Sequence, residues 1–190
     1  MEKAEVKNIA LAAMFLAIGL ILPFFTGQIP QIGNMLLPMH IPVLLCGLIC
    51  GWKYGAIVGL VLPPLRFALF GMPPLLPTGI AMAFELATYG GVIGFWYNRS
   101  KWQCIIALYR AMIIAMVTGR IVWGVAQSIL LGFGGNMFTM KMFMAGAFIN
   151  AVPGIIVQLI LIPTIMIALN RTGVVKFKKN NKESAIKPVN

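Results

Sequence analysis

Apolar residues fill long stretches of this chain, and polar residues are confined to short segments between them. Crossing the hydrocarbon core as a helix takes about 20 mainly apolar residues. Six stretches have this character: 8–25, 39–51, 53–70, 77–97, 104–132 and 145–170. The pattern therefore predicts an all-α integral membrane protein, a bundle of six transmembrane helices.

Two of these stretches depart from a simple spanning helix. The stretch 39–51 is short, since about 13 residues at 1.5 Å each cover only about 20 Å. We expect it to begin earlier in the chain, or to be tilted or partly inserted. In the stretch 53–70, Pro63 and Pro64 lack backbone donors, so we expect a kink or break near its end. We interpret 1–172 as one transmembrane domain and 173–190 as a basic, disordered tail.

Composition supports the membrane interpretation. Hydrophobic residues make up 60% of the chain and charged residues 10%, whereas a soluble domain carries about 25% charged residues. The net charge of +11 comes from basic residues at the ends of the apolar stretches and in the tail. That placement favours contact with an anionic lipid bilayer and argues against a nucleic-acid partner.

The basic residues also predict the orientation. Eleven of them lie in the N-terminus, two connections and the tail, and one, Lys141, lies in the opposite connections. The eleven are Lys3, Lys7, Lys53, Arg99, Lys101, Arg171, Lys176, Lys178, Lys179, Lys182 and Lys187. By the positive-inside rule, both termini are predicted to be cytoplasmic.

This orientation places polar, glycine- and proline-rich segments outside. They are GQIPQIGNMLLP, which begins at Gly27, GMPPLLP (71–77) and GFGGNMFTMK (132–141). Non-helical backbone near a membrane is tolerated where it is buried in protein or lines a cavity. We therefore interpret these segments as a lid over a small-molecule site. The alternative, a set of solvated connectors, would be expected to carry more Ser, Lys, Asp and Glu. The lid interpretation makes Gln28, Gln31, Asn34 and His40 candidate ligand contacts.

Ionisable residues inside the apolar stretches are functional candidates, because burying them in a membrane is costly. Arg66, Glu85 and Arg120 are the main ones, while Arg110 lies closer to the cytoplasmic end and can snorkel. Glu85 and Arg120 could pair across two helices, or each could face a ligand. Uncharged candidates nearby are Tyr89, Trp123, Gln127 and Asn150.

The sequence lacks the signatures of an enzyme. His40 is the only histidine, and there is no HExxH and no Gly-x-Ser-x-Gly. Cys46 and Cys50 have no further ligand at metal-binding spacing, so we interpret them as small buried apolar residues. No metal or cofactor is predicted.

The chain resembles the substrate-binding S component of energy-coupling factor (ECF) vitamin transporters. The resemblance covers residues 5–172 and rests on the first helix, NIALAAMFLAIGLILP (8–23), the external loop after it, and FGMPPLLPTGIAMAFELATYG (70–90). It implies a vitamin bound near the outer face of a bacterial cell membrane. It also implies two kinds of partner, a transmembrane coupling subunit and two ATPases. The family's Ala-x-x-x-Ala docking motif corresponds to Ala13 and Ala17 here.

The ligand is predicted to carry a carboxylate, because Arg66 has no evident acidic partner once Glu85 pairs with Arg120. Pantothenate is the first expectation, with Arg66 or Arg120 holding its carboxylate. Riboflavin, pyridoxine, hydroxymethylpyrimidine and folate are the alternatives within the family. A different class, a self-contained secondary transporter or channel coupled to protons through Glu85, is disfavoured by the lack of a second intramembrane carboxylate and of an inverted repeat.

Overall fold

The computed structural model describes residues 2–26, 37–100, 102–133 and 151–172. All regular elements in these ranges are helical. They are α1 (Glu2–Ile21), the 3-10 segment η1 (Leu22–Thr26), α3 (His40–Cys50), α4 (Trp52–Phe70), a π-type turn η2 (Leu75–Gly79), α5 (Ile80–Arg99), α6 (Ile105–Phe133) and α8 (Val152–Arg171).

Five of the described helices are long and apolar enough to cross a membrane, and α3 is not among them. The expectation that the second apolar stretch is short is confirmed, since α3 has 11 residues and spans about 16 Å. The predicted all-helical, multi-pass character is thus confirmed, with five candidate spans among the described residues. Full crossing by α3 and the cytoplasmic position of both termini stay predictions.

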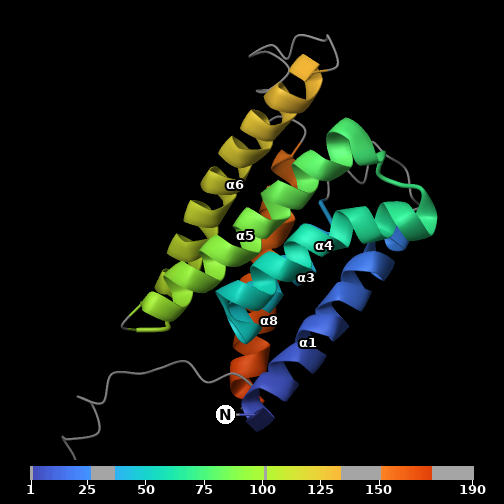
Figure 1. The fold of residues 1–190 in the computed structure, drawn as a ribbon. Helices are drawn as coiled ribbons and strands as arrows, with labels where there is room; N and C mark the ends of the chain where they lie inside the picture. The colour runs from blue at the N-terminus through green and yellow to red at the C-terminus, as the bar shows by residue number, and fades with distance from the viewer. Residues whose placement is uncertain (1, 27–36, 101, 134–150, 173–190) are drawn as a thin grey trace, which may run out of the picture.

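The helices pack around α3 and α5 (Figure 1). α5 lies between α4 and α6, while α1 packs against α3 and α4, and α8 packs against α6 and α3. Ten of the 11 residues of α3 are buried, so this short helix is enclosed by protein. Outward faces carry large apolar side chains such as Ile106 and Ile160, exposed by 74% and 64%, as lipid contact requires.

Glycines bring α3, α4 and α5 into backbone contact. A Cβ on Gly90 of α5 would fall on the carbonyl oxygen of Gly55 in α4, and one on Gly47 of α3 would fall on the carbonyl oxygen of Gly90. Gly59 and Gly94 are equally crowded, by the backbones of Leu86 and of Gly47 and Trp52. Small residues four apart allow such close approach between membrane helices.

The sequence predicted a kink or a break of α4 at its two prolines, and the prediction of a break is wrong. α4 continues as an α-helix from Trp52 to Phe70 with Pro63 and Pro64 inside it. The ring of a helical proline presses on the carbonyl of the residue four positions earlier, and for Pro63 that residue is Gly59, which has no side chain to add to the crowding. Helix neighbours in membrane proteins also compensate for the missing donors.

Candidate functional site

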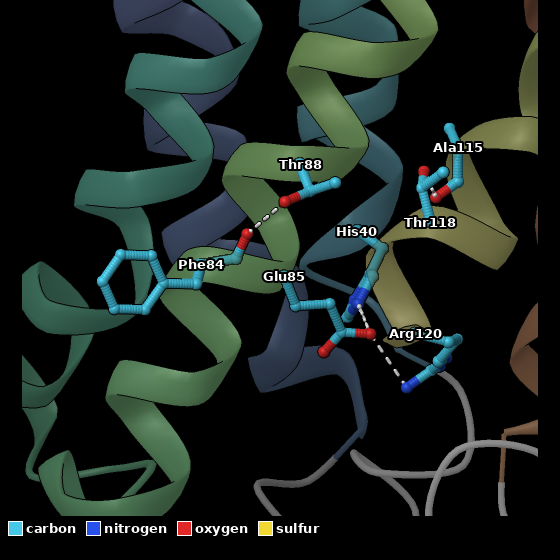
Figure 2. Close-up of polar contacts among 7 residues, drawn as sticks. All are labelled: His40, Phe84, Glu85, Thr88, Ala115, Thr118 and Arg120. Atoms are coloured by element: carbon cyan, nitrogen blue, oxygen red, sulfur yellow. Dashed lines mark hydrogen bonds and ion pairs between the residues drawn. The ribbon is translucent and has the colours of Figure 1, made fainter. Parts of the chain in front are cut away.

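Glu85 lies on the inward face of α5. Buried residues recur on this helix at Ala81, Glu85 and Tyr89, every four positions, so the amphipathic pattern turns the carboxylate inside. Glu85 is 1% exposed. Phe84, its neighbour, points to the other side of α5 (Figure 2) and is 50% exposed.

Arg120 of α6 pairs with this carboxylate. Its Nη1 lies 2.9 Å from Oε1 of Glu85, and Arg120 is 5% exposed. The pairing considered from the sequence is therefore present. Because both charges are removed from water, each depends on the other for compensation, and loss of either partner leaves a costly buried charge.

His40 completes the cluster from a third helix. Its Nε2 lies 3.4 Å from the same Oε1 atom of Glu85, and Figure 2 shows the carboxylate between His40 and Arg120. The turn before α3 places the imidazole here, closed by a hydrogen bond of 3.0 Å from the His40 N–H to the Leu37 carbonyl. Leu37 has φ 50°, an uncommon value for a residue with a side chain.

Tyr89 packs against this cluster one turn along α5 from Glu85. Its ring meets the His40 imidazole edge to face, with centroids 5.0 Å apart. On the side of α6 it meets Gly119, where a Cβ would lie 2.6 Å from Cε2 of the ring. The tyrosine therefore fills the space between α3 and α6 beside the ion pair.

Three nitrogen atoms of the cluster have neither a hydrogen bond nor an ion-pair contact among the described residues. They are Nε and Nη2 of Arg120 and Nδ1 of His40, all buried. Nε and Nη2 share one edge of the guanidinium plane, the edge that Glu85 leaves open. Buried polar atoms are nearly always paired, so this edge is suited to hold a further acceptor with two oxygens.

Arg66 has no acidic partner in the part of the chain that the structure describes, as expected, but a backbone carbonyl and two aromatic rings contact it. Its Nη1 donates a hydrogen bond of 2.7 Å to the Leu20 carbonyl, in the last turn of α1, where carbonyls lose their helical partners. Its guanidinium also lies 5.4 Å and 5.6 Å from the ring centroids of Phe24 and Phe70. These contacts satisfy a buried guanidinium without a ligand anion, so Arg66 serves to join α1 to the end of α4.

The remaining sequence candidates divide into two groups. Gln28, Gln31, Asn34 and Asn150 lie outside the described residues. Trp123 and Gln127 follow Arg120 on α6 and are half-buried.

Arg110 is exposed, as snorkelling requires, and Cys46 and Cys50 are buried free thiols, as predicted. The described part of the chain contains no group of three or more potential metal ligands.

Gln158 of α8 is a buried polar residue that the sequence analysis did not select. It is 1% exposed, and within the described ranges neither atom of its side-chain amide has a hydrogen-bond partner. The available signal was an amide in the otherwise apolar run GIIVQLILIP.

The two alanines of the docking motif lie on the outside of α1. Ala13 and Ala17 are exposed, whereas the nearby Ala12 and Phe15 are buried in the core. Exposed residues with small side chains leave a shallow surface against which another membrane helix can pack closely.

Comparison with known proteins gives two findings. Residues 7–166 match the model of the family described as ECF transporter, substrate-specific component. The chain is also similar to the pantothenic acid transporter PanT of Lactococcus lactis subsp. cremoris (strain MG1363), with 24% identity over 197 residues that cover 90% of this chain and 97% of that protein. The family match spans most of the chain and names a transporter component rather than a class of enzyme. With its apolar helices, this multi-pass membrane protein belongs to the family of substrate-specific components of ECF transporters.

Proposed function

We propose that this S component captures pantothenate at the outer face of the bacterial cytoplasmic membrane. The observation that carries the proposal is the open Nε–Nη2 edge of Arg120, buried and unpartnered among the described residues. A carboxylate matches this edge with two parallel hydrogen bonds. Glu85 holds the other side of the guanidinium, so the open edge is fixed in direction before the ligand arrives.

Pantothenate fits the chemistry of this cluster better than the neutral vitamins do. It has one carboxylate for Arg120, and an amide and hydroxyls that need neutral hydrogen-bonding partners. His40 adds Nδ1, which has no partner among the described residues, while its Nε2 lies 3.4 Å from Glu85. The similarity to a pantothenic acid transporter supports the same choice of vitamin.

Binding measurements on the purified protein test this proposal. Isothermal titration should show pantothenate binding to the wild type, and Arg120→Gln should weaken it by roughly 2–4 kcal/mol, the scale of a lost buried charge-assisted contact. Arg110→Gln, which removes an exposed arginine of the same helix, is the matched control and should bind as the wild type does. Pantothenol, in which an alcohol replaces the carboxylate, should bind weakly to every variant.

A second variant separates binding from folding. Arg120→Gln leaves Glu85 buried without its partner, and this can destabilise the protein by about 3–5 kcal/mol. The double variant Glu85→Gln/Arg120→Gln has no buried charge at this pair and should recover much of the stability while still failing to bind pantothenate. Wild-type affinity in the double variant would exclude Arg120 as the ligand partner, and tight binding of riboflavin or pyridoxine with pantothenate inert would exclude the vitamin.

We also propose that the chain works with a transmembrane coupling subunit and two ATPases. The exposed positions of Ala13 and Ala17 support a docking surface on α1. Uptake of labelled pantothenate should require the ATPase module in the same cells. Uptake without the module would favour a self-contained secondary transporter instead.

The proposed orientation has both termini in the cytoplasm. In a cysteine-free background, Met72→Cys, in the exposed connection after α4, should react with an impermeant thiol reagent added to intact cells. Asn98→Cys, exposed near the other end of α5, should react only after the membrane is permeabilised. The reverse pattern would invert the topology.

A further inference from the structure

Gln158 occupies the centre of the inward face of α8. Buried residues recur on this helix every four positions, at Gly154, Gln158, Ile162 and Met166. Three of these side chains are apolar or absent, so the amide of Gln158 is the one polar group on this buried stripe. The exposed Thr164, by comparison, donates to the Ile160 carbonyl in its own helix.

The face that carries Gln158 looks toward the helices of the Arg120 cluster. α8 packs against α6 and α3, the helices that contribute Arg120 and His40. Figure 1 shows α8 running behind α3 and α5. Arg120, His40 and Gln158 thus come from three helices that pack together. The Tyr109 hydroxyl of α6 donates a hydrogen bond of 3.1 Å to the Leu159 carbonyl, so Gln158 lies deeper along α6 than Arg120, by about three turns, near the core residues Ile162, Met166, Leu108 and Met112.

The side-chain amide of Gln158 is unsatisfied on both atoms. Neither Nε2 nor Oε1 has a partner in the ranges that the structure describes, and the residue is 1% exposed. A buried amide without partners costs free energy on both its donor and its acceptor. The site therefore offers an NH₂ donor group and a carbonyl acceptor together, a combination that matches a hydroxyl or an amide better than a second carboxylate.

We propose that Gln158 is a specificity-determining residue that binds the neutral polar part of the substrate, its hydroxyl or amide groups. This inference rests on the proposed function, in which Arg120 holds the carboxylate. The two side chains then recognise chemically different ends of one ligand. A site built to hydrogen-bond a hydroxyl or amide discriminates strongly against analogues that lack it, because its own buried polar atoms are left unpaired.

Gln158→Leu tests the assignment, since leucine is close in size and has no polar atoms. In isothermal titration, the variant should bind pantothenate at least tenfold more weakly than the wild type. Its melting temperature without ligand should be unchanged or higher, because no hydrogen bond within the described chain is lost. Thr164→Val, on the exposed face of α8, is the matched control and should keep wild-type affinity. Gln158→Met serves in the same way where the leucine variant does not fold.

The analogue series separates this inference from the proposed function. A carboxylate-bearing analogue of pantothenate that lacks both the hydroxyls and the amide should bind the wild type and Gln158→Leu equally, and both should depend on Arg120. Undiminished pantothenate binding by Gln158→Leu and Gln158→Met would overturn the role of Gln158 alone. If the wild type itself does not bind pantothenate, the proposed function fails. The role of Gln158 in ligand binding is then tested by mass spectrometry, which quantifies the small molecule that copurifies with the wild type and with Gln158→Leu. Equal retention would then overturn it.

Discussion

The ring of Tyr89 in α5 packs directly against Gly119 of α6. A Cβ at position 119 would come within 2.6 Å of Cε2 and 2.7 Å of Cδ2 of that ring. Tyr89 is 1% exposed, and its ring also contacts the His40 imidazole, so the ring has little space to move away from residue 119. A single hydrogen atom as the side chain of residue 119 thus sets the separation of α5 and α6 beside the Glu85–Arg120 pair.

Gly119→Ala should accordingly disturb the site through Tyr89. We expect a loss of stability of about 1–3 kcal/mol, the usual cost of overpacking, and weaker ligand binding as Arg120 moves with its helix. Gly132→Ala is the control on the same helix, because among the described residues a Cβ there meets nothing within 4 Å. It should be neutral or slightly stabilising, since alanine favours a helix over glycine. Thermal unfolding and titration of both variants in detergent measure these effects, and identical behaviour would contradict the packing argument.

Arg66 should matter for stability and not for ligand affinity. Arg66→Gln removes the hydrogen bond to Leu20 and the contacts with two phenylalanine rings. We expect the free energy of unfolding to fall by about 1–3 kcal/mol, while pantothenate affinity in the folded fraction stays within about twofold. Arg66→Lys keeps the charge but loses the planar stacking, so it should fall between wild type and Arg66→Gln. A large loss of affinity with unchanged stability would restore Arg66 to the ligand site.

The contrast between Arg66 and Arg120 shows what the sequence could predict. Glu85 is the only acid in the apolar body, so pairing with an arginine on another helix was open to reasoning from residue types. The partner of Arg66 is a main-chain carbonyl at the end of α1, and every residue has such a carbonyl. Side-chain identity therefore carried no signal for that contact.

Other differences between the sequence predictions and the structure have similar physical causes. The apolar stretches predicted the described helices well, because hydrophobic length is what a bilayer selects. The effect of Pro63 on α4 depended on which residue lies one turn earlier, and the burial of Gln158 depended on which face of α8 turns inward. Four of the polar candidates, Gln28, Gln31, Asn34 and Asn150, lie outside the described residues and stay predictions.

The glycine contact between α4 and α5 offers a sharp test of the fold. Gly90→Ala should prevent folding or reduce it severely, because the new methyl group would overlap the backbone of Gly55. Gly91→Ala is the adjacent control, where a Cβ would lie 3.5 Å from the Ala56 Cβ, an ordinary contact. Yield of monodisperse protein in size-exclusion chromatography compares the two. Equal yields would show that the helices are farther apart than this structure has them.

The docking surface on α1 can be tested apart from the ligand site. Ala13→Trp and Ala17→Trp place a bulky ring on an exposed face, so the isolated protein should fold and bind pantothenate with nearly unchanged affinity. Uptake and copurification with the coupling subunit should be lost. Ile57→Trp, at a residue of α4 that is 60% exposed, should leave both intact. Normal uptake by the Ala13→Trp and Ala17→Trp variants would remove α1 as the docking helix.

The glycine contacts among α3, α4 and α5 also determine how the protein can move. Contacts between side chains can be exchanged by changes of rotamer, whereas contacts between backbones have no such alternatives. We therefore expect these three helices to move together as one rigid body, and we expect any sliding at the interfaces that side chains form, including the one between α5 and α6. Glu85 and His40 belong to the rigid body, and Arg120 lies across its boundary. We therefore expect a displacement of α6 relative to α5 to change the Glu85–Arg120 distance while leaving the Glu85–His40 distance nearly unchanged.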